Sequence, residues 1–151
     1  MKAVMYEGIG KISIRDVEKP KIGEDGILVK ILYSFICSTD IKTYKQGHPM
    51  IKPPTILGHE CSGRIVKTGR NVSEFEVGDY VAVAPFVNCG ECEQCINGYP
   101  EGCRTRDFPS NGAITEFLSI DAGYARKGVA KVSKEKVKEA ALAEPMACAL
   151  T

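Results

Sequence analysis

The sequence predicts a mainly β protein with a barrel or sandwich architecture. Short runs with the composition of β-strands fill most of the chain up to residue 120, and clusters of Gly, Pro, Asn and Asp separate them. Runs at this spacing are typical of all-β domains. The chain has 151 residues, which is enough for one domain with a real core and too few for two. The predicted strands are residues 2–7, 11–17, 26–37, 61–69, 79–85 and 113–120.

Two short helices complete the predicted fold. The stretch "STDIKTYKQG" favours a helix with Ser38 or Thr39 as its N-cap, since both hydroxyls can accept a bond from the first helical N–H groups. A second helix is expected from Ser133, again an N-cap residue, in "SKEKVKEAALAEPMACAL". Pro145 should interrupt that helix, because proline cannot donate a backbone hydrogen bond.

Composition limits the classes of partner. The net charge is +1, the charged fraction 26% and the hydrophobic fraction 44%, so nothing points to a nucleic acid or a membrane. The start "MKAVMYEGIGKISIRD" is interrupted by Glu7 and glycines, which excludes a signal peptide and a spanning helix within it, and we expect a cytoplasmic protein. Thiols stay reduced there, so the seven cysteines favour metal over disulfides. Cys61 and Cys148 belong to no spaced group and are expected to be core thiols.

Four of the cysteines form a C-x2-C-x2-C-x7-C pattern within a lobe of about residues 86–108: Cys89, Cys92, Cys95 and Cys103. Four thiolates at this spacing complete the tetrahedral shell of a structural zinc ion. The alternatives are free or disulfide-forming cysteines and an iron–sulfur cluster, whose C-x3-C-P continuation is not found here. Because four thiolates leave no open coordination position, this site is expected to hold the lobe together and to carry no chemistry.

A second set of metal-binding residue types is scattered through the chain. His59 and Glu60 lie in "GHECSGRIVKTGRNV", Cys37 lies in "FICSTD", and Glu144 precedes Pro145. Taken one by one, His59 reads as a hydrogen-bonded barrel residue and Cys37 as a buried apolar thiol.

The motifs taken together resemble the zinc-dependent medium-chain dehydrogenases. The stretch "GHECSGRIVKTGRNV", the four-cysteine lobe and the strand "GDYVAV" occur in that family's order, and "AEPMA" resembles its sorbitol (polyol) dehydrogenase branch. The resemblance covers nearly the whole chain. It implies the N-terminal catalytic domain of such an enzyme, a partly open GroES-like (chaperonin-10-like) β-barrel with short helices and a zinc-binding lobe.

The resemblance also implies roles for particular residues. Cys37 and His59 would be two ligands of a catalytic zinc, and either Glu60 or Glu144 would be the third protein ligand, which leaves one position for water or substrate. Asp40 would hold the ligand histidine through its other ring nitrogen. Thr39 would pass on the proton of the alcohol, unless it serves only as the helix N-cap.

The sequence departs from the family pattern beside this predicted site. Where relatives have a glycine and a relay histidine, "CSTDIK" has Ser38 and Lys42. A relay that ends on Lys42 requires a desolvated, uncharged amine, so relay from Thr39 through water is expected instead. His48 in "KQGHPM" matches no family motif and is expected to be a solvent-facing loop residue.

A dinucleotide-binding fingerprint is missing from these residues. The run "GIGKIS" begins like G-x-G-x-x-G but has Ser13 at the third glycine. The chain ends within the apolar run "MACALT", and in the family the nucleotide-binding domain follows this point. We therefore expect residues 1–151 to be one domain of a longer protein, with its nucleotide-binding domain after residue 151.

The resemblance implies an NAD(P)-dependent alcohol or polyol dehydrogenase that carries two zinc ions per chain, uses NAD or NADP, and forms a homodimer or homotetramer. Zinc would polarise the hydroxyl of a small alcohol or polyol for hydride transfer. The fragment alone should be inactive. The alternative is a stand-alone, noncatalytic zinc-binding barrel module, and thiol redox chemistry ranks third because the cysteine pairs do not start a helix of a βαβ unit.

Overall fold

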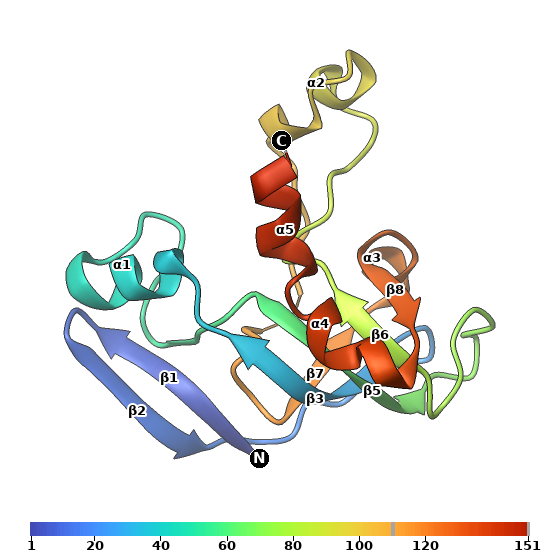
Figure 1. The fold of residues 1–151 in the computed structure, drawn as a ribbon, viewed down its shortest axis with the longest axis horizontal. Coiled ribbons are helices and arrows are strands. Elements are labelled where there is room, and N and C mark those ends of the chain that lie inside the picture. The colour runs from blue at the N-terminus through green and yellow to red at the C-terminus, as the bar shows by residue number, and fades with distance from the viewer. Residues whose placement is uncertain (110, 151) are drawn as a thin grey trace.

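A computed structural model describes residues 1–109 and 111–150 as two antiparallel β-sheets with short helices around them (Figure 1). The smaller sheet has the strand order β2-β1-β4. A tight turn between Gly8 and Lys11 joins β1 and β2 into a hairpin, which projects at the lower left of Figure 1. The strands of this sheet are β1 (Lys2–Gly8), β2 (Lys11–Asp16) and β4 (Thr55–Ile56).

The larger sheet has five strands in the order β7-β3-β5-β6-β8, all paired antiparallel. Its inner face carries most of the hydrophobic core, including the fully buried Ile27, Val29, Ile65, Val81 and Leu118. The strands are β3 (Ile27–Phe35), β5 (Glu60–Thr68), β6 (Tyr80–Val83), β7 (Phe117–Ile120) and β8 (Val129–Val132).

The two sheets are connected through the segment that precedes β7. The Val4 N–H donates to the Ile114 carbonyl (2.9 Å), and the Glu116 N–H donates to the Lys2 carbonyl (3.1 Å). An isolated bridge between Ala3 and Thr115 lies within the same contact. This contact joins the two sheets along β1, the domain is a partly open barrel, and the predicted mainly β class is confirmed.

The described helices are short, and the longest has nine residues. None of them is long and apolar enough to cross a membrane. The α-helices are α1 (Ser38–Gln46), α2 (Glu93–Ile96), α3 (Ala122–Gly128), α4 (Val137–Ala140) and α5 (Ala143–Leu150), and single 3₁₀ turns cover Pro100–Gly102 and Lys134–Lys136.

Two predicted helix starts need correction. The N-cap of α1 is Cys37, so the prediction of Ser38 or Thr39 was wrong; Asp40 at the third helical position accepts the Cys37 N–H instead (3.0 Å). Ser133 does occupy an N-cap position, but it begins a 3₁₀ turn without a side-chain bond. The helical segment breaks between α4 and α5, before Pro145, which lies in the first turn of α5, where its missing N–H has no helical partner to lose.

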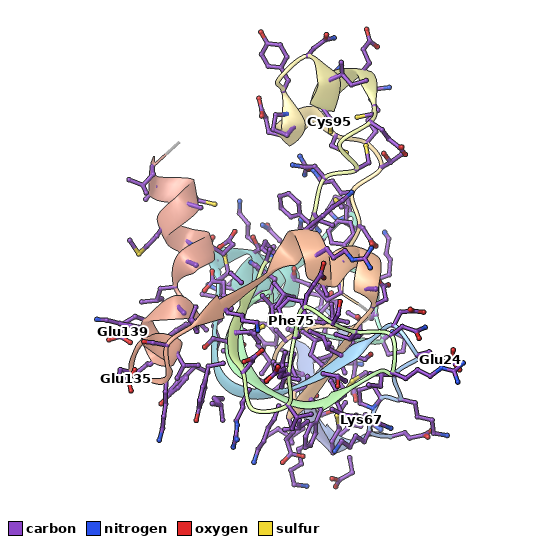
Figure 2. The ribbon with its side chains drawn as sticks, turned by 90° about the vertical axis from the view of Figure 1, so that its right-hand side faces the viewer. Glu24, Lys67, Phe75, Cys95, Glu135 and Glu139 are labelled. Carbon is purple, nitrogen blue, oxygen red and sulfur yellow. The ribbon has the colours of Figure 1, made fainter. Side chains whose placement is uncertain are left out.

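The stretch between β7 and the C-terminal helices contains two elements that the strand pattern did not predict, α3 and β8. Asp121 caps α3 by accepting the Tyr124 N–H (3.0 Å), and Tyr124 itself is fully buried in the core. Figure 2 places Phe75 in the same interior, whereas Glu135 and Glu139 project from the outer side of the C-terminal segment. The core is therefore completed by the 121–129 stretch as well as by the predicted strands.

Candidate functional site

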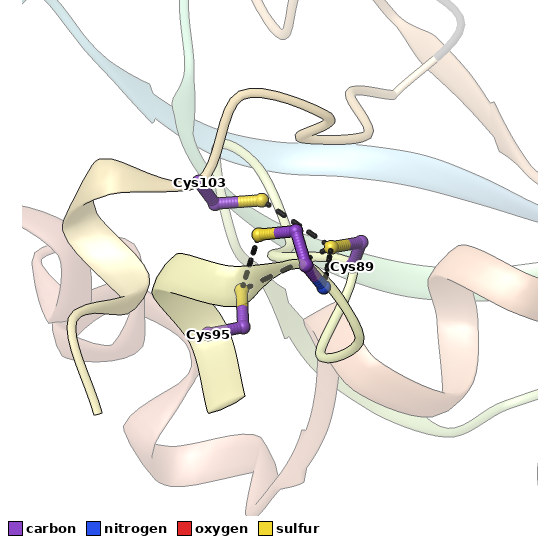
Figure 3. Close-up of side chains that lie close together, drawn as sticks. Cys89, Cys95 and Cys103 are labelled. Atoms are coloured by element: carbon purple, nitrogen blue, oxygen red, sulfur yellow. Dashed lines mark hydrogen bonds between the residues drawn. The ribbon is translucent and has the colours of Figure 1, made fainter. Parts of the chain in front are cut away.

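The four clustered cysteines converge on one point in a lobe that stands away from the sheets (Figures 1 and 3). Their sulfur atoms all lie within 4.8 Å of one another. The closest pairs are Cys92–Cys95 at 3.5 Å, Cys89–Cys103 at 3.6 Å and Cys89–Cys95 at 3.9 Å. Sulfurs bound tetrahedrally to zinc at about 2.3 Å would be about 3.8 Å apart. The arrangement thus fits a zinc ion, and none of the seven cysteines, all of which the structure describes, forms a disulfide.

The base of the lobe is closed by contacts between its two connecting segments. An antiparallel bridge joins Val87 and Asp107, and the rings of Phe86 and Phe108 pack with centroids 6.2 Å apart. Both contacts lie at the ends of the predicted range 86–108. The four cysteines are thereby held on a short, closed excursion from the barrel.

Hydrogen bonds within the lobe favour the ionised forms of Cys89 and Cys103, since they lower the pKa of both thiols. The Thr105 hydroxyl and the backbone N–H groups of residues 91 and 92 lower the pKa of Cys89 to about 6. Burial raises the pKa of Cys95 to about 12. The four thiols are thus not equivalent before a cation binds.

A second group of donor atoms forms where the end of β3 lies beside the start of β5. Phe35 and Glu60 are paired across these strands, which places Cys37, two residues beyond Phe35, next to Glu60 and His59. The sulfur of Cys37, a ring nitrogen of His59 and a carboxylate oxygen of Glu60 all lie within 4.8 Å of one another. A thiolate, an imidazole and a carboxylate form a three-ligand set suited to zinc, and such a set leaves a fourth position open.

Asp40 lies behind this group and is 4% exposed. One carboxylate oxygen accepts the Cys37 N–H (3.0 Å); the other accepts the Gly58 N–H (3.2 Å) and lies 3.9 Å from Nδ1 of His59. A carboxylate on this side favours the proton on Nδ1, which leaves the lone pair of Nε2 for a metal. Asp40 thus links the backbone on both sides of the donor group.

Gly58 is required by the backbone that presents His59. Its φ is +93°, and a Cβ at this position would lie 2.8 Å from the Ile114 nitrogen and 2.4 Å from its Cγ1. Residues with side chains rarely adopt this conformation, and here the nearest obstacle includes main chain. The fold therefore requires a glycine at position 58, directly before His59.

His59 of this group lines a pocket of about 750 Å³, and Thr39 and Glu144 line it as well. Thr39 has its hydroxyl 3.8 Å from the Cys37 sulfur. Glu144 reaches the pocket from α5 but is not part of the three-ligand group, and it accepts a hydrogen bond from the Cys148 thiol (3.5 Å). Of the two carboxylates predicted as third ligand, Glu60 is the one that the structure brings within reach of Cys37 and His59 together.

Several residues near the pocket lie elsewhere than predicted. His48 is half-buried and lines the pocket, so its prediction as a solvent-facing loop residue was wrong; Lys42 is exposed and is not among the lining residues. Cys61 is a buried thiol, as predicted, and burial raises its pKa to about 12. Cys148 is exposed, so its prediction as a core thiol was wrong.

Sequence reasoning did not single out Lys52 and Arg106, which also line the pocket. No spacing rule connects residue 52 with residue 106. The loop after α1 brings Lys52 to the pocket that His59 lines, and the return of the chain from the cysteine lobe brings Arg106.

The fold is a partly open β-barrel with two groups of potential metal ligands, one of four cysteines and one of Cys37, His59 and Glu60. Residues 23–133 match the alcohol dehydrogenase GroES-like domain, and the chain belongs to this family. The resemblance of the sequence to the N-terminal domain of zinc-dependent alcohol and polyol dehydrogenases is thereby confirmed.

Known relatives support the same assignment over nearly the whole chain. Sorbitol dehydrogenase of Bacillus subtilis (strain 168) is 36% identical over 152 residues, which cover 96% of this chain and 42% of that protein. Galactitol-1-phosphate dehydrogenase of Escherichia coli superposes with a TM-score of 0.86 at 28% identity, over 99% of this chain and 43% of that one. A candidate zinc-binding dehydrogenase of Sinorhizobium meliloti 1021, solved bound to NADP, gives 0.83 at 31% identity over 99% and 43%. The chain thus spans about two fifths of the length of these relatives.

Proposed function

We propose that the chain is the zinc-bearing catalytic domain of an NAD(P)-dependent alcohol or polyol dehydrogenase. The observation that carries the proposal is the donor group of Cys37, His59 and Glu60, whose His59 lines a pocket of about 750 Å³. A purely structural zinc module would need only the four-cysteine lobe. A second donor set with room for substrate beside it is what a catalytic site requires.

Two zinc ions per chain are proposed. Cys89, Cys92, Cys95 and Cys103 would hold the structural ion, and Cys37, His59 and Glu60 would hold the catalytic ion, with Glu144 as an alternative carboxylate from the pocket wall. When bound in the second group, zinc supplies a Lewis acid that makes a substrate hydroxyl more acidic.

The surrounding residues position the ligands and move the proton. Asp40 keeps the His59 ring in one orientation and tautomer, since its oxygens are anchored by backbone N–H groups. The Thr39 hydroxyl, beside the Cys37 sulfur and open to the pocket, is placed to accept the proton of the alcohol and to pass it to water. Apolar side chains such as Val83 and Leu118 line the inner wall and limit the access of water.

The partners proposed for the parent enzyme come from its relatives. The 36% identical relative is a sorbitol dehydrogenase, which favours a polyol or another small alcohol as substrate. A neighbour solved with NADP supports a nicotinamide cofactor, either NAD or NADP, bound by a domain that follows residue 151. Residues 1–151 alone would then be inactive, and the parent enzyme is expected in the cytoplasm as a homodimer or homotetramer.

The test is the zinc content of the purified chain, measured by elemental mass spectrometry before any exposure to chelator or added metal. Two zinc ions per chain, reduced to one by Cys37→Ser, support the proposal. One ion that is unaffected by Cys37→Ser and lost in Cys92→Ser would instead favour a noncatalytic zinc-binding module.

A further inference from the structure

The pocket beside His59 carries more basic than acidic side chains. Three basic residues besides His59 line it from two segments: His48 and Lys52 on the loop after α1, and Arg106 at the return from the cysteine lobe. The carboxylates in the lining are those of Asp40 and Glu144. A pocket built only for a neutral alcohol would have no need for these basic side chains.

Arg106 is held in place and keeps hydrogen-bonding capacity. Its guanidinium carbon lies 4.6 Å from the centre of the Phe86 ring, and one Nη donates to the Glu101 carbonyl. Its Nε is buried and has no hydrogen-bond partner among the described residues. No described carboxylate lies within 4.0 Å of its nitrogens. A buried, unsatisfied N–H of a charged group is costly, and a bound anion would satisfy it.

Neither Lys52 nor His48 pairs with a carboxylate among the described residues. Lys52 is exposed and takes part in no described ion pair. Nδ1 of His48 accepts the Met50 N–H (3.2 Å), so the neutral ring carries its proton on Nε2 and remains a donor there. Together these groups offer an arginine fork, an ammonium and an imidazole donor.

The acidic side chains of the pocket do not offset this charge at the basic side. Both oxygens of Asp40 are taken up by the N–H groups of Cys37 and Gly58 beside His59. Glu144 accepts the Cys148 thiol on α5. Asp40 is thus bound beside the metal-ligand group and Glu144 has a partner on its own helix, so Arg106 and Lys52 remain for a substrate group of opposite charge.

We propose that the substrate is a phosphorylated small polyol whose phosphate is bound by Arg106 and Lys52, with His48 as a further donor. This inference rests on the proposed function, because the reacting hydroxyl must reach the group formed by Cys37, His59 and Glu60. A phosphate monoester carries close to two negative charges at neutral pH and three acceptor oxygens, which matches several cationic donors better than a carboxylate does. The planar fork of arginine suits bidentate binding to such a group.

Binding to the zinc-loaded chain tests the inference without any need for turnover. Isothermal titration calorimetry would compare D-sorbitol 6-phosphate, D-sorbitol and inorganic phosphate. We expect the ester to bind at least about tenfold more tightly than either, and less tightly as salt is added, because charge-assisted bonds of this kind are strong and screened. Equal affinity for the ester and for sorbitol, or for the ester and inorganic phosphate, would overturn the inference. So would tighter binding of the carboxylate D-gluconate.

Variants separate the proposed contacts from general charge. Arg106→Gln and Lys52→Gln should each weaken binding of the ester about tenfold or more and leave binding of sorbitol unchanged. The matched controls are Arg104→Gln and Lys67→Gln, which remove the same charges at exposed positions outside the pocket (Lys67 is labelled in Figure 2). Equal losses in the controls would refute specific contacts. The zinc content verifies that the Arg106→Gln variant keeps the folded lobe. Lys52→Gln tests the same phosphate site independently, because Lys52 is exposed on a loop outside the lobe.

The zinc count distinguishes failure of this inference from failure of the proposed function. Two zinc ions with no preference for the ester would overturn the phosphate site alone. A single zinc ion, bound in the lobe, would overturn the dehydrogenase proposal and with it the idea that the bound polyol reacts. If such a protein still bound the ester, and bound it less tightly after Arg106→Gln, only the proposed contacts to the phosphate would be supported.

Discussion

Oδ1 of Asp40 lies 3.9 Å from Nδ1 of His59 and accepts the N–H of Gly58, the residue just before that histidine. One buried carboxylate thus contacts both the proposed ligand ring and the backbone that carries it. The same side chain accepts the N–H of Cys37, the second proposed ligand. Two donors from distant parts of the sequence therefore share a single anchor.

This relationship predicts the effect of Asp40→Asn. The amide keeps the shape but loses the charge that holds the proton on Nδ1 of His59, so zinc affinity of the second group should fall about 10- to 100-fold. Competition with a chromophoric chelator would measure it. Asp16→Asn, which alters an exposed carboxylate paired with Lys2, is the control and should leave affinity unchanged. Unchanged affinity in Asp40→Asn would show that the carboxylate has no part in ligand positioning.

The two candidate carboxylate ligands are separable by substitution. Glu60 is 5% exposed and lies within 4.8 Å of the Cys37 and His59 donor atoms, whereas Glu144 is outside that group. We expect Glu60→Gln to lower the zinc content by one ion per chain and Glu144→Gln to retain both ions. The opposite pattern would assign the third ligand to Glu144 from α5.

The cysteine lobe should depend on its metal. Cys92→Ser removes one of four sulfurs, and a structural zinc site with three thiolates loses its closed shell, so one zinc ion per chain should be lost. Limited proteolysis should then cut between residues 88 and 103. Cys148→Ser, at an exposed thiol outside both donor groups, serves as the control. A lobe that resists proteolysis without zinc would contradict a structural role for the metal.

Gly58→Ala should destabilise the fold through the backbone. The positive φ of +93° and the close approach to Ile114 leave no room for a methyl group, and a strained residue of this kind costs about 1–3 kcal/mol. Chemical denaturation gives the free energy of unfolding. The comparison is Gly23→Ala, where a Cβ meets nothing within 4 Å and no positive φ is required. Equal free energies of unfolding for the two variants would contradict a steric requirement for glycine at position 58.

Asp79 should contribute to acid sensitivity. A hydrogen bond from the Lys131 ammonium, 2.8 Å away, and one from the Glu76 N–H hold the pKa of this carboxyl below its ordinary 3.8. Because the folded-state pKa is the lower one, the contribution is present above pH 3.8 and is lost as the pH falls through and below that value. Lys131→Gln should reduce stability by a few tenths of a kcal/mol at neutral pH, as for surface ion pairs, with less loss in acid.

Unfolding followed by circular dichroism at neutral pH and below pH 3.8 would measure this dependence. Lys67→Gln, at an exposed lysine with no described ion pair, is the matched control. Parallel stability curves for wild type and Lys131→Gln across this range would contradict the prediction.

Local patterns predicted much of this domain. Six strands were found close to their predicted positions because alternating apolar residues between turn residues leave few other local structures. The last of these, predicted for 113–120, begins only at Phe117, since the residues before it bond to β1 and to residues 57–58. The elements β4, α2, α3 and β8 were missed because each is short, and Asp121 is the residue whose side chain caps α3.

The sequence by itself determined the mainly β class and the four-cysteine group, because both depend on spacing over a few residues. Tertiary structure decided what surrounds the second group. Pairing of β3 with β5 brings Cys37 to Glu60, and the return of the chain from the lobe brings Arg106 to the wall of the same pocket. Contacts between residues that are distant in the chain depend on strand register and on the paths of connecting segments, and no local pattern encodes those.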